Sequence, residues 1–344
     1  MITLGASLML QEARSSADCV AHQLTQDGER YAALGEHLRA STLHSAVTVA
    51  RGSSDHASGY LAYLIMARMG RLVTSLPMSL ITLYKSPIAT RDTLAIAISQ
   101  SGQSPDVVEP MQYFRQGGAT TVALVNDAAS PLAQAAEWIM PLHAGREKSV
   151  AATKSFIASL VAGARLVAAW QNDPQLQDGI AALPESLAAA AEFDWSPALK
   201  VLAPARNIMV VGRGVGFPLA LEAALKFKET SSLQAEAFSG AEIKHGPMAL
   251  IDNGYPLLIF ATRGPTQAGL VALADEMRGR GAQVLLAAPR DVASRDLTLP
   301  TAAIPDLDPI AAVQAFYVMA AYLAATRNMD PDRPRHLSKV TRTS

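Results

Sequence analysis

The fold of this chain is decided by residues 93–109, TLAIAISQSGQSPDVVE. The apolar run 93–98 has the length of a buried strand, and the polar loop 99–104 follows it directly. Ser104 suits the N-cap of a helix, Pro105 its first position and Asp106 its first turn. The stretch therefore predicts a strand, a tight turn and a helix in direct succession.

The predicted turn carries a concentration of small polar side chains. A strand-to-helix turn leaves backbone N–H groups pointing at one spot, near the positive end of the helix dipole. The hydroxyls of Ser99, Ser101 and Ser104 and the amide of Gln100 gather around that spot. This arrangement suits a doubly charged tetrahedral anion, so we interpret it as a phosphate cradle. A solvated polar turn with one capping serine is the alternative interpretation.

The residues on either side repeat the same alternation of strands and helices. Helical spacing is found at 8–40, 56–69 and 153–170, and apolar strand-length runs at 46–50, 73–76, 120–125 and 138–142. A second small polar turn, Gly52-Ser53-Ser54, follows the strand expected at 46–50. Strands separated by helices predict parallel βαβ units and a doubly wound α/β sheet.

The pattern restarts after Trp195-Ser196-Pro197. Strands are expected at 208–211, 256–260 and 284–286, and helices at 218–233 and 309–327. The two halves form a diverged repeat, in which Arg213-Gly214 matches Ser53-Ser54 and 262–266 matches 99–104. Only the first copy keeps hydroxyl-rich loops, which favours one phosphate per chain. We expect a first domain at 1–190, a second at 191–330 and a tail or lid at 331–344.

Composition excludes several classes of function. The 344 residues carry 29 basic and 30 acidic side chains, and this balance argues against binding to nucleic acid. One cysteine, Cys19, excludes an internal disulfide, and the seven histidines have no metal-ligand spacing, so no metal is expected. Residues 1–4 make a poor secretion signal, and the apolar run 310–325 suits a buried helix better than a membrane span. We expect a cytoplasmic protein.

One predicted helix carries charged residues on a single face. Glu222, Lys226 and Glu229 are spaced i, i+4 and i+7 within 218–233. The common outcome of such spacing is a solvent-facing stripe of ion pairs. This helix, however, begins at a glycine-rich strand end, where doubly wound folds bind ligands. A carboxylate and an ammonium pressed together there can move a proton.

Two further segments are candidates for chemistry. His245 is flanked by a Gly-Pro turn and is predicted to lie on a loop, which makes it an acid–base candidate. The segment 331–339 is basic, so it is either a frayed terminus or a lid that closes over a phosphosugar. The glycines at 212, 214 and 216 have GxGxG rather than GxGxxG spacing, which disfavours a nicotinamide site.

Six motifs in order resemble the sugar isomerase (SIS) family, from about residue 8 to the end of the chain. The resemblance is closest to the isomerase half of glucosamine-6-phosphate synthase and to stand-alone deaminases of that type. The motifs are 52–54, 99–104, 150–154, 223–229, 242–247 and 334–339. The resemblance implies two flavodoxin-like SIS domains, no cofactor, and a homodimer or larger assembly with shared active sites.

The resemblance also implies a role for each site residue. Glu229 would move a proton between C1 and C2 of the sugar, and Lys226 would stabilise the enediolate-like charge. His245, contributed by a neighbouring subunit, would open the sugar ring, and Lys339 would meet the open-chain carbonyl. The substrate-binding residues that it implies are Gly52, Ser53, Ser54, Ser99, Gln100, Ser101, Ser104, Val150 and Ala151.

The chain departs from the synthase pattern at several places. Gln103 stands where the synthase loop carries glutamate, and Gln234 replaces a histidine. We expect no glutaminase domain before residue 8. We therefore expect an isomerase and deaminase that converts glucosamine 6-phosphate to fructose 6-phosphate and ammonia. A sugar-phosphate sensor without turnover is one alternative. A deglycase of fructosamine-type 6-phosphate conjugates is another, because it uses the same fold and proton chemistry.

Overall fold

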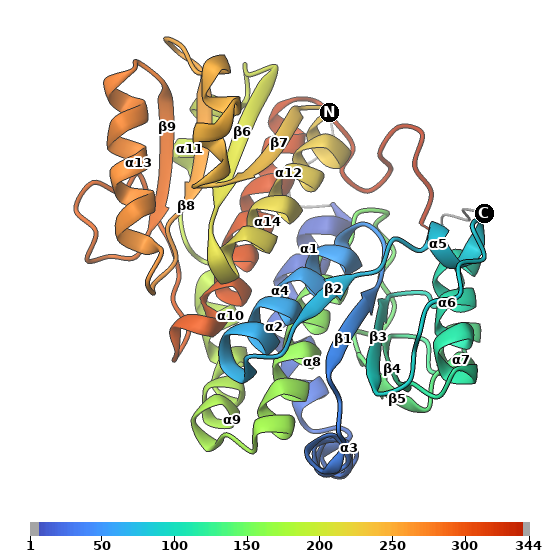
Figure 1. Cartoon of the computed structure of the whole chain (residues 1–344). Coiled ribbons are helices and arrows are strands. Elements are labelled where there is room, and N and C mark those ends of the chain that lie inside the picture. The colour runs from blue at the N-terminus through green and yellow to red at the C-terminus, as the bar shows by residue number, and fades with distance from the viewer. Residues whose placement is uncertain (1–6, 340–344) are drawn as a thin grey trace. The chain divides into compact units, whose positions relative to one another are not determined.

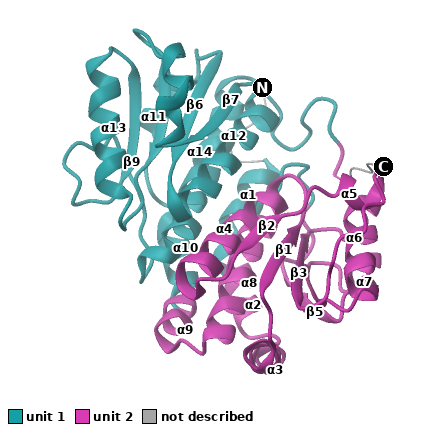
Figure 2. Cartoon of the chain, in the orientation of Figure 1, with its two compact units in different colours: residues 1–17, 148–153, 182–337 teal, residues 18–147, 154–181, 338–344 magenta. Residues whose placement is uncertain are grey.

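The computed structural model describes residues 7–339, which fall into two compact units (Figures 1 and 2). Unit 1 comprises Met1–Ala17, Lys148–Thr153 and Ala182–Leu337, and unit 2 comprises Asp18–Glu147, Lys154–Ala181 and Ser338–Ser344. The N-terminal residues 1–4, expected not to be a secretion signal, and residues 340–344 of the expected tail lie outside the described residues. The domain boundary expected at 190/191 stays a prediction.

Unit 2 contains a five-stranded sheet with the order β2-β1-β3-β4-β5, in which all neighbours are parallel. Its strands are β1 (Ser45–Val49), β2 (Val73–Ser75), β3 (Thr93–Ser99), β4 (Thr120–Val125) and β5 (Trp138–Pro141). The central strand β3 is buried along nearly its whole length, because helices cover both faces of the sheet.

The helices of unit 2 divide between the two faces of this sheet. Alternate side chains of the strands, such as Ala95 and Ala97, pack with Val107, Met111 and Phe114 in one core cluster. Helix α8 packs against both α3 and α4. The helices are α2 (Ser16–Leu24), α3 (Gly28–Ala40), α4 (Ser53–Met69), α5 (Ser79–Thr82), α6 (Pro105–Gln116), α7 (Pro131–Ala135), α8 (Lys154–Gln171) and α9 (Pro174–Ala181).

Unit 1 contains a second five-stranded parallel sheet, with the order β10-β9-β8-β6-β7. Its strands are β6 (Asn207–Gly212), β7 (Gln234–Ser239), β8 (Pro256–Phe260), β9 (Gln283–Ala288) and β10 (Leu297–Thr298). Its helices are α1 (Leu8–Arg14), α10 (Leu183–Ala190), α11 (Ser196–Leu202), α12 (Phe217–Ser231), α13 (Gln267–Gly279) and α14 (Asp308–Thr326). Short 3₁₀ turns are η1 (Gly214–Gly216), η2 (Glu242–His245), η3 (Pro247–Leu250) and η4 (Pro305–Leu307).

The apolar helix near the C-terminus belongs to the core of unit 1. Among the described residues, the segment Pro305–Thr326 is long and apolar enough to cross a membrane, yet 83% of its most apolar window is buried inside the protein. Its residue Phe316 contacts Phe227 of α12 edge-on, with ring centroids 5.2 Å apart. The apolar run therefore forms a core helix, as the sequence predicted.

The prediction of two doubly wound α/β domains is confirmed, and both sheets have the same strand order when numbered within each unit. Residues 8–40 are helical as expected and form three helices. Two helix boundaries were wrong. The helix expected from 56 begins at Ser53. The helix expected to reach 233 ends at Ser231, since Ser232 is left-handed with φ 47°, and the edge strand β7 follows. Strand β7 has exposed and half-buried residues rather than an apolar run, which explains why it was missed.

We predict that Gly35→Ala destabilises unit 2. A Cβ at Gly35 of α3 would lie 2.4 Å from the carbonyl oxygen of Ala169 in α8, so one helix must shift. Such overpacking costs about 1–3 kcal/mol and should lower the midpoint of urea unfolding. Gly28→Ala in the same helix is the matched control, because nothing lies within 4 Å of its added Cβ. Equal midpoints for the two variants would contradict the close helix contact.

Candidate active site

The first loop of the proposed cradle is the N-terminus of helix α4. Gly52 is the N-cap residue, and Ser53 and Ser54 form the start of the helix. The two serines are half-buried, and their backbone N–H groups belong to the first turn, where a helix has no internal acceptors. The structure therefore puts two hydroxyls and the N–H groups of a helix N-terminus at the carboxyl end of β1.

The second loop of the cradle, 99–104, is held in shape by its own hydrogen bonds. The Gly102 N–H donates to Ser99 Oγ at 3.0 Å, and the Gln103 N–H donates to Ser101 Oγ at 3.4 Å. Gly102 has φ +63°, and a Cβ there would lie 2.2 Å from Ser130 Oγ. Glycine is the residue that fits this turn, so the loop adopts its conformation without a bound anion.

The two loops share one edge of the sheet because β1 and β3 are parallel neighbours, with Val49 opposite Ala97. The chain leaves β1 toward β2 and β3 toward β4, in opposite directions along the sheet. This is the switch point at which doubly wound sheets bind ligands. A cavity of about 570 Å³ in the same unit is lined by Gln100 and by residues that follow β4 and β5, among them Asn126 and His143.

The corresponding loops of unit 1 differ from those of unit 2 in their side-chain contacts. A Cβ on Gly214 would meet Thr266 at 3.2 Å, whereas a Cβ on Gly52 would have nothing within 4 Å. The Arg263 guanidinium bonds to the buried carboxylate of Asp308 at 2.6 Å. That only the first copy binds a phosphate stays a prediction.

Helix α12 of unit 1 carries a buried cluster of three charges. The Lys226 ammonium has no exposed surface and lies 3.2 Å from the buried Glu222 carboxylate. It also bonds to Glu229, whose side chain is 20% exposed. The Tyr317 hydroxyl of α14 donates to Glu222 at 2.9 Å. The three residues do share one face, but that face is buried, so the interpretation as a solvated stripe is wrong.

The electrostatics of this cluster keep Lys226 charged. Burial by itself lowers the pKa of a lysine, but here Glu222 and Glu229 outweigh burial, so the pKa of Lys226 is raised. The two carboxylates share one ammonium, and Glu222 is already fixed by Tyr317. Glu229 is therefore the carboxylate of the cluster that a molecule outside can reach.

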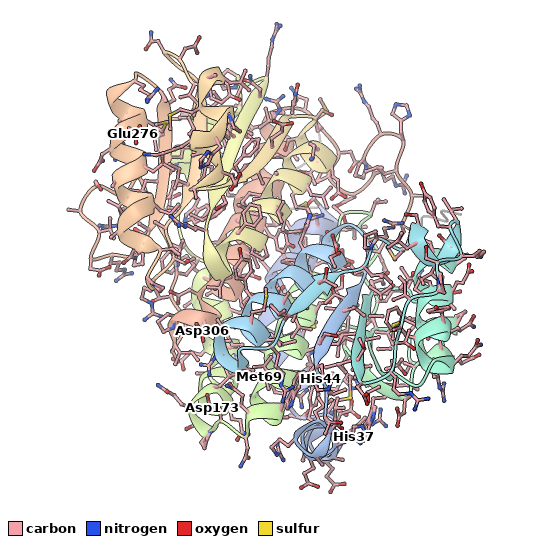
Figure 3. The ribbon with its side chains drawn as sticks, in the orientation of Figure 1. His37, His44, Met69, Asp173, Glu276 and Asp306 are labelled. Atoms are coloured by element: carbon pink, nitrogen blue, oxygen red, sulfur yellow. The ribbon has the colours of Figure 1, made fainter. Side chains whose placement is uncertain are left out.

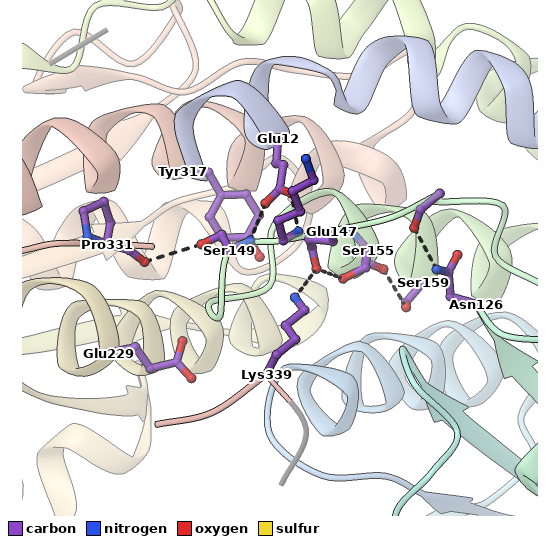
Figure 4. A network of polar contacts seen from close by, with 12 residues as sticks. Glu12, Asn126, Glu147, Ser149, Ser155, Ser159, Glu229, Tyr317, Pro331 and Lys339 are labelled. Carbon is purple, nitrogen blue, oxygen red and sulfur yellow. Dashed lines mark hydrogen bonds and ion pairs between the residues drawn. The ribbon is translucent and has the colours of Figure 1, made fainter. Parts of the chain in front are cut away.

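Lys339, in the tail, forms part of a polar network in unit 2 (Figure 4). Its Nζ donates to Glu147 Oε2 at 2.9 Å, and this carboxylate is fully buried. Glu147 also accepts hydrogen bonds from Ser155, from the backbone N–H at 3.2 Å and from Oγ at 2.5 Å. The tail lysine is thus held at one place by a carboxylate that is itself held by α8.

The segment that contains Val150 and Ala151 is fixed within unit 1 by a carboxylate side chain and by backbone carbonyls of the tail (Figure 4). The Ser149 N–H donates to the Glu12 carboxylate at 3.1 Å, and Ser149 Oγ donates to the Pro331 carbonyl at 3.4 Å. The Val150 N–H donates to the Asp332 carbonyl at 3.1 Å. The backbone that the sequence assigned to substrate binding is therefore ordered by the start of the tail.

His245 lies at the end of the 3₁₀ turn η2 and is exposed. Its neighbour Lys244 bonds at 2.6 Å to Glu276 of α13, the helix on which Figure 3 labels this residue. No hydrogen bond or ion pair of the His245 side chain is found within the described residues. The turn is anchored, but its imidazole faces solvent.

The structure thus brings together Lys226 with Glu229, and the serines of the two cradle loops at one sheet edge. It leaves His245 apart, on an exposed turn. Sequence reasoning missed Glu147, since it stands in a charged run with Arg146 and Lys148 that is typical of a solvated loop. Within residues 7–339, no group of three His, Cys, Asp or Glu side chains is arranged to hold a metal.

Comparisons with known proteins agree on one family. The SIS domain family model matches residues 41–169 and 201–324. The glutamine–fructose-6-phosphate aminotransferase of Zymomonas mobilis is 31% identical over 310 residues, which are 85% of this chain and 51% of that protein. The chain therefore spans about half the length of the curated relatives that it matches.

Solved structures are similar over the whole chain. A protein of Silicibacter pomeroyi, assigned as a phosphosugar isomerase, is 38% identical with a TM-score of 0.91, over 95% of this chain and 100% of that one. Glucosamine-6-phosphate deaminase of Thermotoga maritima is 21% identical with a TM-score of 0.77, over 98% of this chain and all of that one. The latter similarity shows the fold alone.

We predict that Glu222→Gln and Glu229→Gln differ in their effects on the stability of unit 1. Glu222→Gln removes a fully buried charge that faces Lys226 and should cost about 1–3 kcal/mol, measured by urea unfolding. Glu229 is partly exposed, so Glu229→Gln should leave the unfolding midpoint near that of the unaltered protein. A larger loss of stability in Glu229→Gln than in Glu222→Gln would contradict the assignment of Glu222 as the structural carboxylate.

Proposed function

Since the chain belongs to the SIS domain family, we propose that it is a phosphosugar aldose–ketose isomerase that deaminates an amino-sugar 6-phosphate. The substrate that we favour is glucosamine 6-phosphate, with fructose 6-phosphate and ammonia as products. In this proposal the enzyme is cytoplasmic, needs no cofactor and acts on a small molecule. The phosphate is bound by the loops 52–54 and 99–104.

The observation that carries this proposal is the fully buried Lys226 paired with the partly exposed Glu229. A sensor needs only to bind the sugar phosphate, and a desolvated ammonium gives it no advantage. Taking such a charge out of water is costly unless it is paired. An accessible carboxylate next to a fixed ammonium, however, is what proton transfer beside a developing negative charge requires.

The reaction follows from these two groups. Once the sugar ring is open, Glu229 removes the proton from C2 while Lys226 stabilises the negative charge that develops on the oxygen at C1. Glu229 then returns the proton to C1. The oxygen at C1 gains a proton as the nitrogen loses one, so that C1 becomes the hydroxymethyl group and the nitrogen is left as an imine at C2. Water adds to this imine and ammonia leaves, which yields the ketose phosphate. Lys339, held by Glu147, would meet the carbonyl of the open chain.

The exposed position of His245 supports a shared active site. A ring-opening acid or base has to reach the sugar, but the His245 side chain has no partner among the described residues. We propose a homodimer or larger assembly in which His245 serves the site of a neighbouring subunit. A two-fold axis would make this exchange reciprocal.

We predict that Glu229→Gln lowers ammonia release from glucosamine 6-phosphate by about 10²–10⁴-fold, the usual contribution of a positioned general base. The rate is measured with a coupled ammonia assay, and deuterium from solvent at C1 of the product is followed by NMR. Lys228→Gln, an exposed neighbour on the same helix, is the matched control and should keep the rate. Near-normal release by Glu229→Gln would remove this residue from the mechanism. Galactosamine and fructosamine 6-phosphates test the choice of sugar.

We predict that two inactive variants restore activity when they are mixed. His245→Ala and Glu229→Gln chains are each inactive, but a hybrid dimer would contain one intact site and regain up to about half of the activity. Native mass spectrometry verifies that subunits have exchanged. If hybrids form and no activity returns, both residues serve the same chain and the shared site is wrong.

A further inference from the structure

Arg51 stands at the junction of the two cradle loops. It lies two residues after the end of β1 and directly precedes Gly52, so it belongs to the first loop. Its Nε donates to Asp106 Oδ2 at 2.9 Å, and Asp106 lies in the first turn of α6, directly after the second loop. One side chain therefore connects the two segments that would surround a phosphate.

Asp106 places a negative charge where the cradle needs a positive one. Its side chain is only 4% exposed, and it occupies the second position of the helix whose N-terminus faces the cradle. A carboxylate there is favourable for the helix dipole but repels a phosphate dianion at the same helix end. The hydroxyls of the cradle serines are neutral, so they do not offset this charge.

The Arg51 guanidinium has donors to spare. Its side chain is 58% exposed, and only Nε is used by Asp106. Within the described residues, Nη1 and Nη2 have no hydrogen-bond acceptor. A guanidinium presents its N–H groups in a rigid planar fork that matches phosphate oxygens, and one edge of this fork is open here.

We propose that Arg51 is the cation of the phosphate site, anchored by Asp106 through Nε and donating to phosphate oxygens through its terminal amino groups. This inference rests on the proposed function and adds to it the charge that a cradle of hydroxyls lacks. A lysine at this position would bind the phosphate less well, because its ammonium is a point charge without the planar fork that can hold Asp106 with one N–H and face phosphate oxygens with the others. Arg51 thereby sets the preference for phosphorylated over free sugars.

Calorimetric titration with inorganic phosphate tests the assignment without any turnover. Arg51→Ala and Arg51→Lys should each weaken phosphate binding at least tenfold. The same variants should raise the KM for glucosamine 6-phosphate with little change in kcat. Lys85→Ala is the matched control, since Lys85 forms a 2.6 Å ion pair with Glu109 of the same helix and should leave binding unchanged. Thermal melting verifies that each variant folds.

The double variant Arg51→Ala/Asp106→Asn separates direct contact from charge compensation. If Arg51 touches phosphate, removing the Asp106 charge leaves binding at least fivefold weaker than in the unaltered protein. Full recovery of phosphate binding in the double variant would mean that Arg51 only neutralises Asp106. Unchanged phosphate binding in Arg51→Ala would also contradict the role of Arg51, but not the phosphate site formed by the two loops. If the unaltered protein binds no phosphate, the cradle itself is wrong, and the role of Arg51 fails with it.

Discussion

Parallel strand pairing is the constraint on which both units depend. Because every strand in a sheet points the same way, all the loops that follow the strands lie along one edge. At the β1/β3 pair the chain departs in opposite directions, so neither crossover covers the loops between them. Ser54 and Ser99, 45 positions apart in the chain, are thereby brought to the ends of adjacent strands.

Burial of a charge shapes the Lys226 cluster of unit 1. An ammonium without exposed surface requires close counter-charges, and Glu222 and Glu229 supply them from the same helix. Tyr317 completes the hydrogen bonding of Glu222, which fixes that carboxylate in the core. Glu229 keeps 20% of its side chain exposed. The same cluster thus divides into a structural carboxylate and an accessible one.

The two copies of the fold differ in the side chains around their switch points. Both sheets have the same topology and both have a switch point. In unit 1 the place is occupied by Thr266 against Gly214 and by the ion pair of Arg263 with Asp308. In unit 2 the space beside Gly52 stays open. Side chains of the loops, rather than the path of the backbone, make the difference.

The sequence by itself determined the two doubly wound sheets and the pairing of Lys226 with Glu229, because apolar runs and helical spacing are local patterns. Only the tertiary structure decided that Lys226 is buried while Glu229 stays partly exposed, since spacing defines a face of α12 but not what covers it. Glu147 with Lys339, and Arg51 with Asp106, were likewise beyond the sequence. These partners lie 192 and 55 positions apart, and no local pattern links residues that meet only when strands and tail are folded together.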